Sequence, residues 1–249
     1  MPREMRVLTR SDILPPLQYA QERGSERQRI AALKRRRRVE VGPFVTCHFE
    51  NYETMRHQVQ EMLFIEKGGE AQIEGELGAY NPLIPKENEL SATVMIEIDD
   101  ATRRRAELSR LGGIEDAAFL EIAGRRIKGE ADTSRENTSP EGRASAVQFV
   151  KFRLDLKAGV RFRTPGERVL LGFDHPNYGH LAVLPEETRK ALAEEKKGHS
   201  GGEEAEYPSN ALALHRAAIL AAEERFYGEL EKLVQKAHPE RARKRDDED

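Results

Sequence analysis

Residues 48–66 carry the side chains best suited to chemistry. Imidazole and carboxylate groups gather in HFENYETMRHQVQEMLFIE, and iron, manganese and zinc accept both as ligands. Glu53, His57 and Glu61 are spaced i, i+4 and i+8, so they form one line along a helix. Eight residues rise about 12 Å, which is too far for both glutamates to hold one ion comfortably. We therefore predict that His57 shares a metal ion with one of them.

The same helix allows a second interpretation, in which this line is solvated surface. The apolar face holds Tyr52, Met55, Val59, Met62 and Leu63. The line through His57 lies nearly opposite that face, and a polar line in this position is usually in water. Phe64 departs from the pattern, because it falls one heptad after His57. Something is therefore expected to cover that side near the helix end.

A second group of polar side chains occurs at residues 174–180, DHPNYGH, at a predicted strand end and turn. We predict His175 and His180 as further metal ligands, on condition that the fold brings this turn onto the polar line of the first helix. A metal-dependent enzyme with a His/carboxylate site would follow, although the pattern identifies no catalytic residue. The alternative is a Pro-Asn-Tyr-Gly turn that carries surface histidines.

Residues 34–38 form a compact basic block, which consists of Lys34, Arg35, Arg36, Arg37 and Arg38. Such a block can meet phosphates or an acidic protein partner. A helical context spreads the five charges around all sides, and no aromatic residues interleave to stack on bases. Nucleic-acid binding through this block is therefore disfavoured, and protein docking is the preferred interpretation.

Composition excludes several classes of protein. The chain has 249 residues and no apolar run that approaches the roughly 18–20 residues of a membrane-spanning helix. Its start lacks the apolar region of a secretory signal, so a cytoplasmic location is expected. The single cysteine, Cys47, excludes a disulfide framework. Its neighbour His48 points to the opposite face of an extended segment, so the two cannot act together as a Cys–His nucleophile pair. The P-loop, GxGxxG, GxSxG and CxxC motifs do not occur, which disfavours nucleotide, dinucleotide, α/β-hydrolase and thiol-redox sites, respectively.

The net charge of −3 conceals blocks of opposite sign, with 41 Lys and Arg against 44 Asp and Glu. Residues 1–43 hold 11 basic and 5 acidic side chains, whereas residues 44–102 hold 3 and 12. This alternation predicts surfaces of opposite sign, which suit docking to other proteins. The acidic block includes the helix with the His/carboxylate line.

The periodicity changes from helical to extended near residue 90. Helices are predicted over residues 17–38, 52–67 and 70–80, with Asn51 as an N-cap, and the strands follow, with a hairpin at 118–131. The fold class is therefore α+β: N-terminal helices packed on an antiparallel or mixed sheet, with an appended C-terminal helix.

The predicted organisation is an α+β domain over residues 1–195, a linker over 196–209, a C-terminal helix over 210–238 and a disordered tail over 239–249. The helix gathers apolar residues near one side. It packs on its own domain in one interpretation and makes an oligomer contact in the other.

Several stretches together resemble a bacterial family of cytosolic proteins that is catalogued as a domain of unknown function. They are LTRSDIL (8–14), KRRRRVEVG (34–42), FENYETMRHQVQEML (49–63), AYNPLIP (79–85), ELSATVMIEI (89–98) and DHPNY (174–178). The resemblance covers roughly residues 5–195. The resemblance implies that members of the family are encoded beside rubrerythrin-like proteins and beside iron–sulfur oxidoreductases related to heterodisulfide reductase subunits. An accessory role in redox or peroxide-stress work, with such partners, is the function that the resemblance implies.

Overall fold

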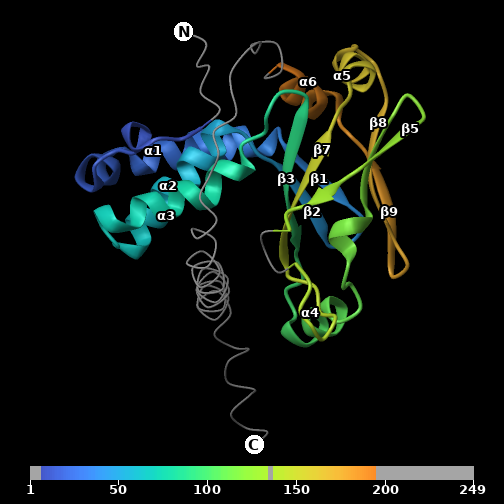
Figure 1. Cartoon of the computed structure of the whole chain (residues 1–249), viewed down its shortest axis with the longest axis horizontal. Coiled ribbons are helices and arrows are strands. Elements are labelled where there is room, and N and C mark those ends of the chain that lie inside the picture. The colour runs from blue at the N-terminus through green and yellow to red at the C-terminus, as the bar shows by residue number, and fades with distance from the viewer. Residues whose placement is uncertain (1–6, 134–136, 195–249) are drawn as a thin grey trace, which may run out of the picture. The chain divides into compact units, whose positions relative to one another are not determined.

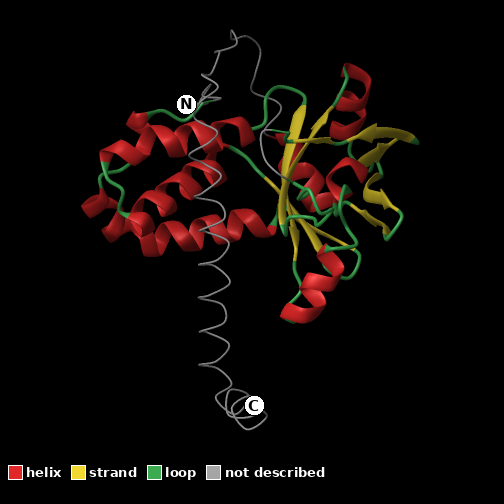
Figure 2. Ribbon diagram, turned by 60° about the horizontal axis from the view of Figure 1, so that its bottom comes forward, coloured by secondary structure: helices red, strands yellow, loops and turns green. Residues whose placement is uncertain are grey.

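The structure is a computed structural model that describes residues 7–133 and 137–194. It contains the helices α1 (Pro16–Arg35), α2 (Tyr52–Glu66), α3 (Glu70–Tyr80), α4 (Ala101–Leu108), α5 (Leu156–Arg163) and α6 (Glu186–Glu194), with short 3-10 turns at Arg10–Asp12, Asn81–Leu83 and Ile114–Ala117. None of these described helices is long and apolar enough to cross a membrane. Helices α1, α2 and α3 lie together on one side of the molecule, and the strands lie on the other (Figures 1 and 2).

The strands form two antiparallel sheets. They are β1 (Arg38–Val41), β2 (Val45–Phe49), β3 (Glu89–Ile96), β4 (Ala118–Ile122), β5 (Arg125–Lys128), β6 (Glu130–Ala131), β7 (Val147–Arg153), β8 (Val169–His175) and β9 (Tyr178–Val183). The five-stranded sheet has the order β1-β2-β3-β7-β6, and the four-stranded sheet has the order β5-β4-β8-β9. The predicted α+β class is thus confirmed, and the predicted sheet divides into two.

Local signals explain most element boundaries. The Asn51 side chain accepts a hydrogen bond from the Thr54 amide at 2.9 Å, which caps α2 as predicted. The helix ends at Lys67, whose φ of 55° is left-handed, just before the predicted glycine stop. The β4–β5 hairpin turns through Ala123 and Gly124, both with positive φ, as a two-residue hairpin of this kind requires.

Two elements differ from the sequence prediction. Helix α1 ends at Arg35 rather than residue 38, because the chain then enters β1, where Val39 and Val41 are buried in the core. Helix α5 was not predicted at all. Its signal is the Asp155 carboxylate, which accepts a hydrogen bond from the Ala158 amide at 2.8 Å. The linker 196–209, the helix 210–238 and the tail 239–249 lie outside the described residues.

The two sheets meet where β1 contacts β8 and β9. The Tyr178 hydroxyl is the polar link at this point: it donates to the Val41 carbonyl at 2.6 Å and accepts from the amides of Phe44 and Val45 at 3.3 and 3.2 Å. The β1–β2 turn passes so close that a side chain at Gly42 would lie 2.6 Å from this hydroxyl, and the φ of Gly42 is +74°. One phenol group thus satisfies three backbone groups of the first hairpin.

Replacement of Tyr178 by Phe tests this link. Removal of the hydroxyl leaves the Val41 carbonyl and two amides without that partner, so we expect the free energy of unfolding to fall by about 2–3 kcal/mol. Urea unfolding followed by circular dichroism measures this change. A loss below about 0.5 kcal/mol would show that the sheets do not depend on the hydroxyl.

Candidate functional site

The polar line of α2 faces α1. Helix α1 buries only Tyr19 and Ile30 along its whole length, so apolar packing alone does not hold it in place. On α2, Met55, Val59 and Met62 are buried, as the predicted apolar face requires. The interface between the two helices therefore depends on polar contacts made by the side of α2 that carries the His57 line.

One end of this interface is centred on the Glu61 carboxylate. Its Oε1 accepts hydrogen bonds from the Tyr19 hydroxyl at 2.6 Å and from Arg23 Nε at 2.8 Å, and its Oε2 accepts from Arg23 Nη2 at 2.9 Å. The Phe64 ring lies alongside, 4.9 Å from the Arg23 guanidinium and edge-on to Tyr19 at 5.6 Å. Helix α1 is thus the element that covers Phe64, and the line is not a solvated face.

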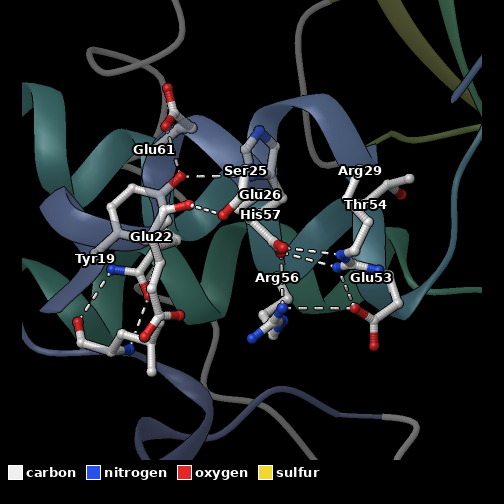
Figure 3. A network of polar contacts seen from close by, with 12 residues as sticks. Tyr19, Glu22, Ser25, Glu26, Arg29, Glu53, Thr54, Arg56, His57 and Glu61 are labelled. Carbon is white, nitrogen blue, oxygen red and sulfur yellow. Dashed lines mark hydrogen bonds and ion pairs between the residues drawn. The ribbon is translucent and has the colours of Figure 1, made fainter. Parts of the chain in front are cut away.

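The other end is a ring of alternating charges. Arg29 donates to both carboxylate oxygens of Glu26 at 2.8 Å and to Glu53 Oε2 at 2.8 Å. Arg56 donates to Glu26 Oε1 at 2.8 Å and lies 3.6 Å from Glu53. Figure 3 shows this ring on one side of His57, with Tyr19 and Glu61 on the other. Two carboxylates and two guanidinium groups therefore neutralise one another between the helices.

These contacts shift the ionisation of their members. Burial and the hydrogen bond to Glu61 raise the pKa of Tyr19, so the phenol stays protonated. Burial opposes the ionisation of Glu61, but the hydrogen bonds from Arg23 and Tyr19 outweigh it and lower the pKa of this carboxyl group. The hydrogen bond from Arg29 lowers the pKa of Glu26. The carboxylates of Glu61 and Glu26 are therefore held in the charged form.

His57 lies between the two clusters and has weaker contacts. Its Nδ1 lies 3.5 Å from the Tyr19 hydroxyl, at the outer limit of a hydrogen bond. Burial lowers the pKa of the imidazole and outweighs Glu61, which acts in the opposite direction. The lowered pKa keeps the ring neutral near pH 7. A neutral imidazole can accept a proton or bind a metal ion. Its glutamate neighbours, however, already have arginine partners that a metal ion would have to displace.

The histidines of the second predicted group lie elsewhere. His175 Nε2 donates to the Gly112 carbonyl at 3.1 Å, and His175 Nδ1 accepts from the Asn177 amide at 3.2 Å. The His180 ring packs edge-on against Tyr178 at 4.5 Å. The β8–β9 hairpin that carries them is far from α2 in both views (Figures 1 and 2). The fold therefore does not bring His175 and His180 onto the His57 line.

Within the described parts of the chain, no group of three or more His, Cys, Asp or Glu side chains is placed to hold a metal ion. Metal binding by Glu53, His57 and Glu61 stays a prediction, and it requires ligands besides these three.

The five residues of the basic block have different surroundings. Arg37 is 2% exposed and donates to the carbonyls of Phe49 and Glu50 at 2.7 and 3.1 Å, so its charge is directed into the protein. Arg36 pairs with Glu187 of α6 at 3.2 Å, and Arg38 pairs with Glu40 at 3.1 Å. Lys34 is half-buried and Arg35 is exposed. The block is therefore no continuous basic stripe.

A cavity of about 270 Å³ adjoins this block between α1 and α6. Its lining residues are Leu33, Arg36, Arg37, Ala191 and Glu194. The Arg37 guanidinium in its wall already binds main-chain carbonyls, and Arg36 is paired. This cavity therefore offers an anionic ligand little free positive charge.

The partners on α1 were not recognised from the sequence. Tyr19, Arg23, Glu26 and Ile30 recur at i, i+4, i+7 and i+11, which places them on one face of the helix. Polar and apolar residues mix in this stripe, so a hydrophobic pattern does not reveal it. The matching spacing of opposite charges on α1 and α2 is the signal that could have identified the pair.

The pH dependence of stability tests the Glu61 cluster. Because folding lowers the pKa of Glu61 below its ordinary value of about 4.5, the cluster stabilises the fold above that pH, and the stabilisation is lost as the pH falls through the folded pKa. We expect the free energy of unfolding of Glu61→Gln to be about 1–3 kcal/mol below that of the wild type at pH 7. On acidification, the free energy of unfolding should fall less for Glu61→Gln than for the wild type.

Chemical denaturation at several pH values measures both effects. Glu22→Gln on the exposed side of α1 is the matched control, with an expected change within about 0.5 kcal/mol. Parallel pH profiles for the wild type and Glu61→Gln would contradict the assignment.

The predicted metal line has its own test. If His57 binds a metal ion, protein purified without chelators should contain iron, manganese or zinc, and His57→Ala should contain less. Elemental analysis of both proteins measures this difference. Equal metal content in the two would rule out His57 as a ligand.

Comparison with known proteins places the chain among relatives. A crystal structure of a novel protein of unknown function from Burkholderia pseudomallei K96243 is 37% identical, covers 76% of this chain and 98% of its own, and superposes with a TM-score of 0.71. None of the curated proteins matches the chain. Residues 7–196 match the family model described as protein of unknown function (DUF3501). The chain therefore belongs to the DUF3501 family.

Proposed function

We propose that this protein is an accessory protein of a cytoplasmic redox or peroxide-stress system. In this role it acts with a rubrerythrin-like protein and an iron–sulfur oxidoreductase, and it docks to them rather than catalysing a reaction itself. The choice of partners rests on the resemblance of the quoted sequence stretches to the family. The docking role has support from the side-chain contacts described above.

One observation carries the proposal. The His/carboxylate line of α2 is turned toward α1. There Arg23 donates hydrogen bonds to the Glu61 carboxylate, and Arg29 donates to the Glu53 carboxylate. These groups therefore hold two helices together, which is a structural task. Such an interface supports a rigid helical platform for protein contacts more readily than a catalytic centre.

Two exposed arginines lie near this platform, Arg35 at the end of α1 and Arg38 at the start of β1. Arg35 is exposed, and Arg38 is 43% exposed beside its partners Glu40 and Glu97. Arg37 does not contribute, since it is buried. An acidic partner surface would find these two guanidinium groups accessible, and charges at the rim of an interface mainly accelerate and orient association.

A metal-dependent enzyme is the second candidate, and His57 is the observation that favours it. Its imidazole is neutral and, among the described residues, has only the long contact to Tyr19, so it keeps the capacity to bind a metal ion or a proton. Comparison of metal content between the wild type and His57→Ala separates this candidate from the accessory role.

Affinity capture from the native organism tests the accessory role. We expect the tagged full-length chain to recover a rubrerythrin-like protein and an iron–sulfur oxidoreductase, identified by mass spectrometry. The variant Arg35→Glu/Arg38→Glu should recover at least about fivefold less, because it reverses the accessible charges. Recovery should also fall as the salt concentration rises.

The matched control is Arg103→Glu/Arg105→Glu, which reverses two exposed arginines on α4. It should recover the same partners as the wild type. Failure to recover either redox protein would overturn the proposal. Recovery of nucleic acid through the basic block, abolished by the first variant alone, would favour a nucleic-acid-binding protein instead.

A further inference from the structure

A second polar cluster lies on the neighbouring strands β2 and β3. His48 pairs with Thr93 across the two strands, and the Glu50 amide donates to the Ser91 carbonyl at 2.7 Å. Alternate residues of a strand point to the same face, so these four side chains share one face of the five-stranded sheet. Cys47 points to the opposite face and is buried in the core.

Among the residues that the structure describes, three polar atoms of this cluster are buried without a hydrogen-bond partner: His48 Nε2, Glu50 Oε2 and Ser91 Oγ. Glu50 is 5% exposed and Ser91 is 1% exposed. The Thr93 hydroxyl donates to Glu50 Oε1 at 2.6 Å, which fixes the carboxylate and leaves its second oxygen unpaired. Buried polar groups are almost always satisfied, so these three atoms on one sheet face require a partner such as an ion or ordered water.

The charges around His48 define which ligand fits. Burial lowers the pKa of the imidazole, Glu50 and Glu97 oppose that shift, and Lys34 and Arg38 reinforce it. His48 Nε2 and Glu50 Oε2 are a nitrogen and an oxygen donor of the kinds that divalent first-row metal ions accept. Arg38 is itself paired with Glu40 and Glu97, which compensates its charge.

Strand geometry permits the two strongest donors to act together. Residues i and i+2 of a strand are about 7 Å apart, and imidazole nitrogen and carboxylate oxygen bind zinc at about 2.0–2.2 Å. His48 and Glu50 can therefore converge on one ion, since both side chains extend several ångströms from the strand. Ser91 can add a hydroxyl oxygen to the same site.

We propose that His48 and Glu50 bind a divalent first-row transition-metal ion on this sheet face, with the Ser91 hydroxyl and water completing the coordination. His48 lies in β2, Glu50 directly follows that strand, and Ser91 lies in β3. Lys34 opposes a bound cation, and the site has two strong ligands. We therefore expect moderate affinity, in the micromolar range.

This site is separate from the His57 line, because His48 lies in β2, Glu50 directly follows β2, and His57 lies in α2. It is also independent of the docking role, which concerns the exposed Arg35 of α1 and Arg38 of β1. The two proposals can therefore fail separately.

Zinc binding to the full-length chain tests the site. The protein is stripped with a chelator and desalted, and ZnCl₂ binding is followed by isothermal titration calorimetry and by elemental analysis after equilibrium dialysis. We expect one ion per chain, with affinity reduced by about tenfold or more in His48→Asn and in Glu50→Gln. Lys34→Gln should bind more tightly, because it removes the opposing charge.

His180→Asn and His57→Asn are the matched controls, and both should bind zinc as the wild type does. Circular dichroism of each variant confirms that the near-isosteric replacements leave the fold intact. Absence of saturable zinc binding, or equal binding by the wild type, His48→Asn and Glu50→Gln, would overturn the proposal.

Discussion

The buried guanidinium of Arg37 connects the N-terminal helices to the strands through hydrogen bonds. It lies just after α1 and binds the carbonyls of Phe49 and Glu50, where β2 ends and α2 is about to begin. The Arg37 carbonyl in turn accepts a hydrogen bond from the Phe49 amide at 2.9 Å. One residue thereby fixes both helices to the edge of the five-stranded sheet. Both candidate sites adjoin this connection. The α1–α2 interface lies on the helical side of Arg37, and the His48 cluster lies on the strand side.

Charge compensation inside the protein explains how so polar a chain folds. A third of its residues are charged, and many of the charges are placed where two elements meet rather than in open water. The Glu61 cluster and the Glu26–Arg29–Glu53–Arg56 ring take the place of an apolar seam between α1 and α2. Charged pairs require matched geometry to offset their loss of hydration, and the bidentate contacts of Arg23 with Glu61 and of Arg29 with Glu26 meet that requirement. The apolar core lies instead between the two sheets and beneath α2.

The fold class and many local boundaries could be predicted because their causes are local. The Asn51 cap, the left-handed end of α2 and the positive-φ turn of the β4–β5 hairpin each depend on residues within a few positions of one another. The end of α1 was harder to place, since the pull of Val39 and Val41 into the core overrides the helix preference of the arginines before them. Helix α5 was missed because its cap residue, Asp155, follows a strand without a break.

The sequence by itself determined the α+β class, the alternation of charge blocks, the opposite directions of Cys47 and His48, and the concentration of imidazole and carboxylate groups before and within α2. Only the tertiary structure decided what those groups touch. It covered the His57 line with α1, gave Glu53 and Glu61 arginine partners, separated His175 and His180 from them, and left His48 and Glu50 buried with unpaired atoms. The reason is physical: the spacing of residues along one helix fixes their direction, whereas the partner across an interface comes from a segment dozens of residues away.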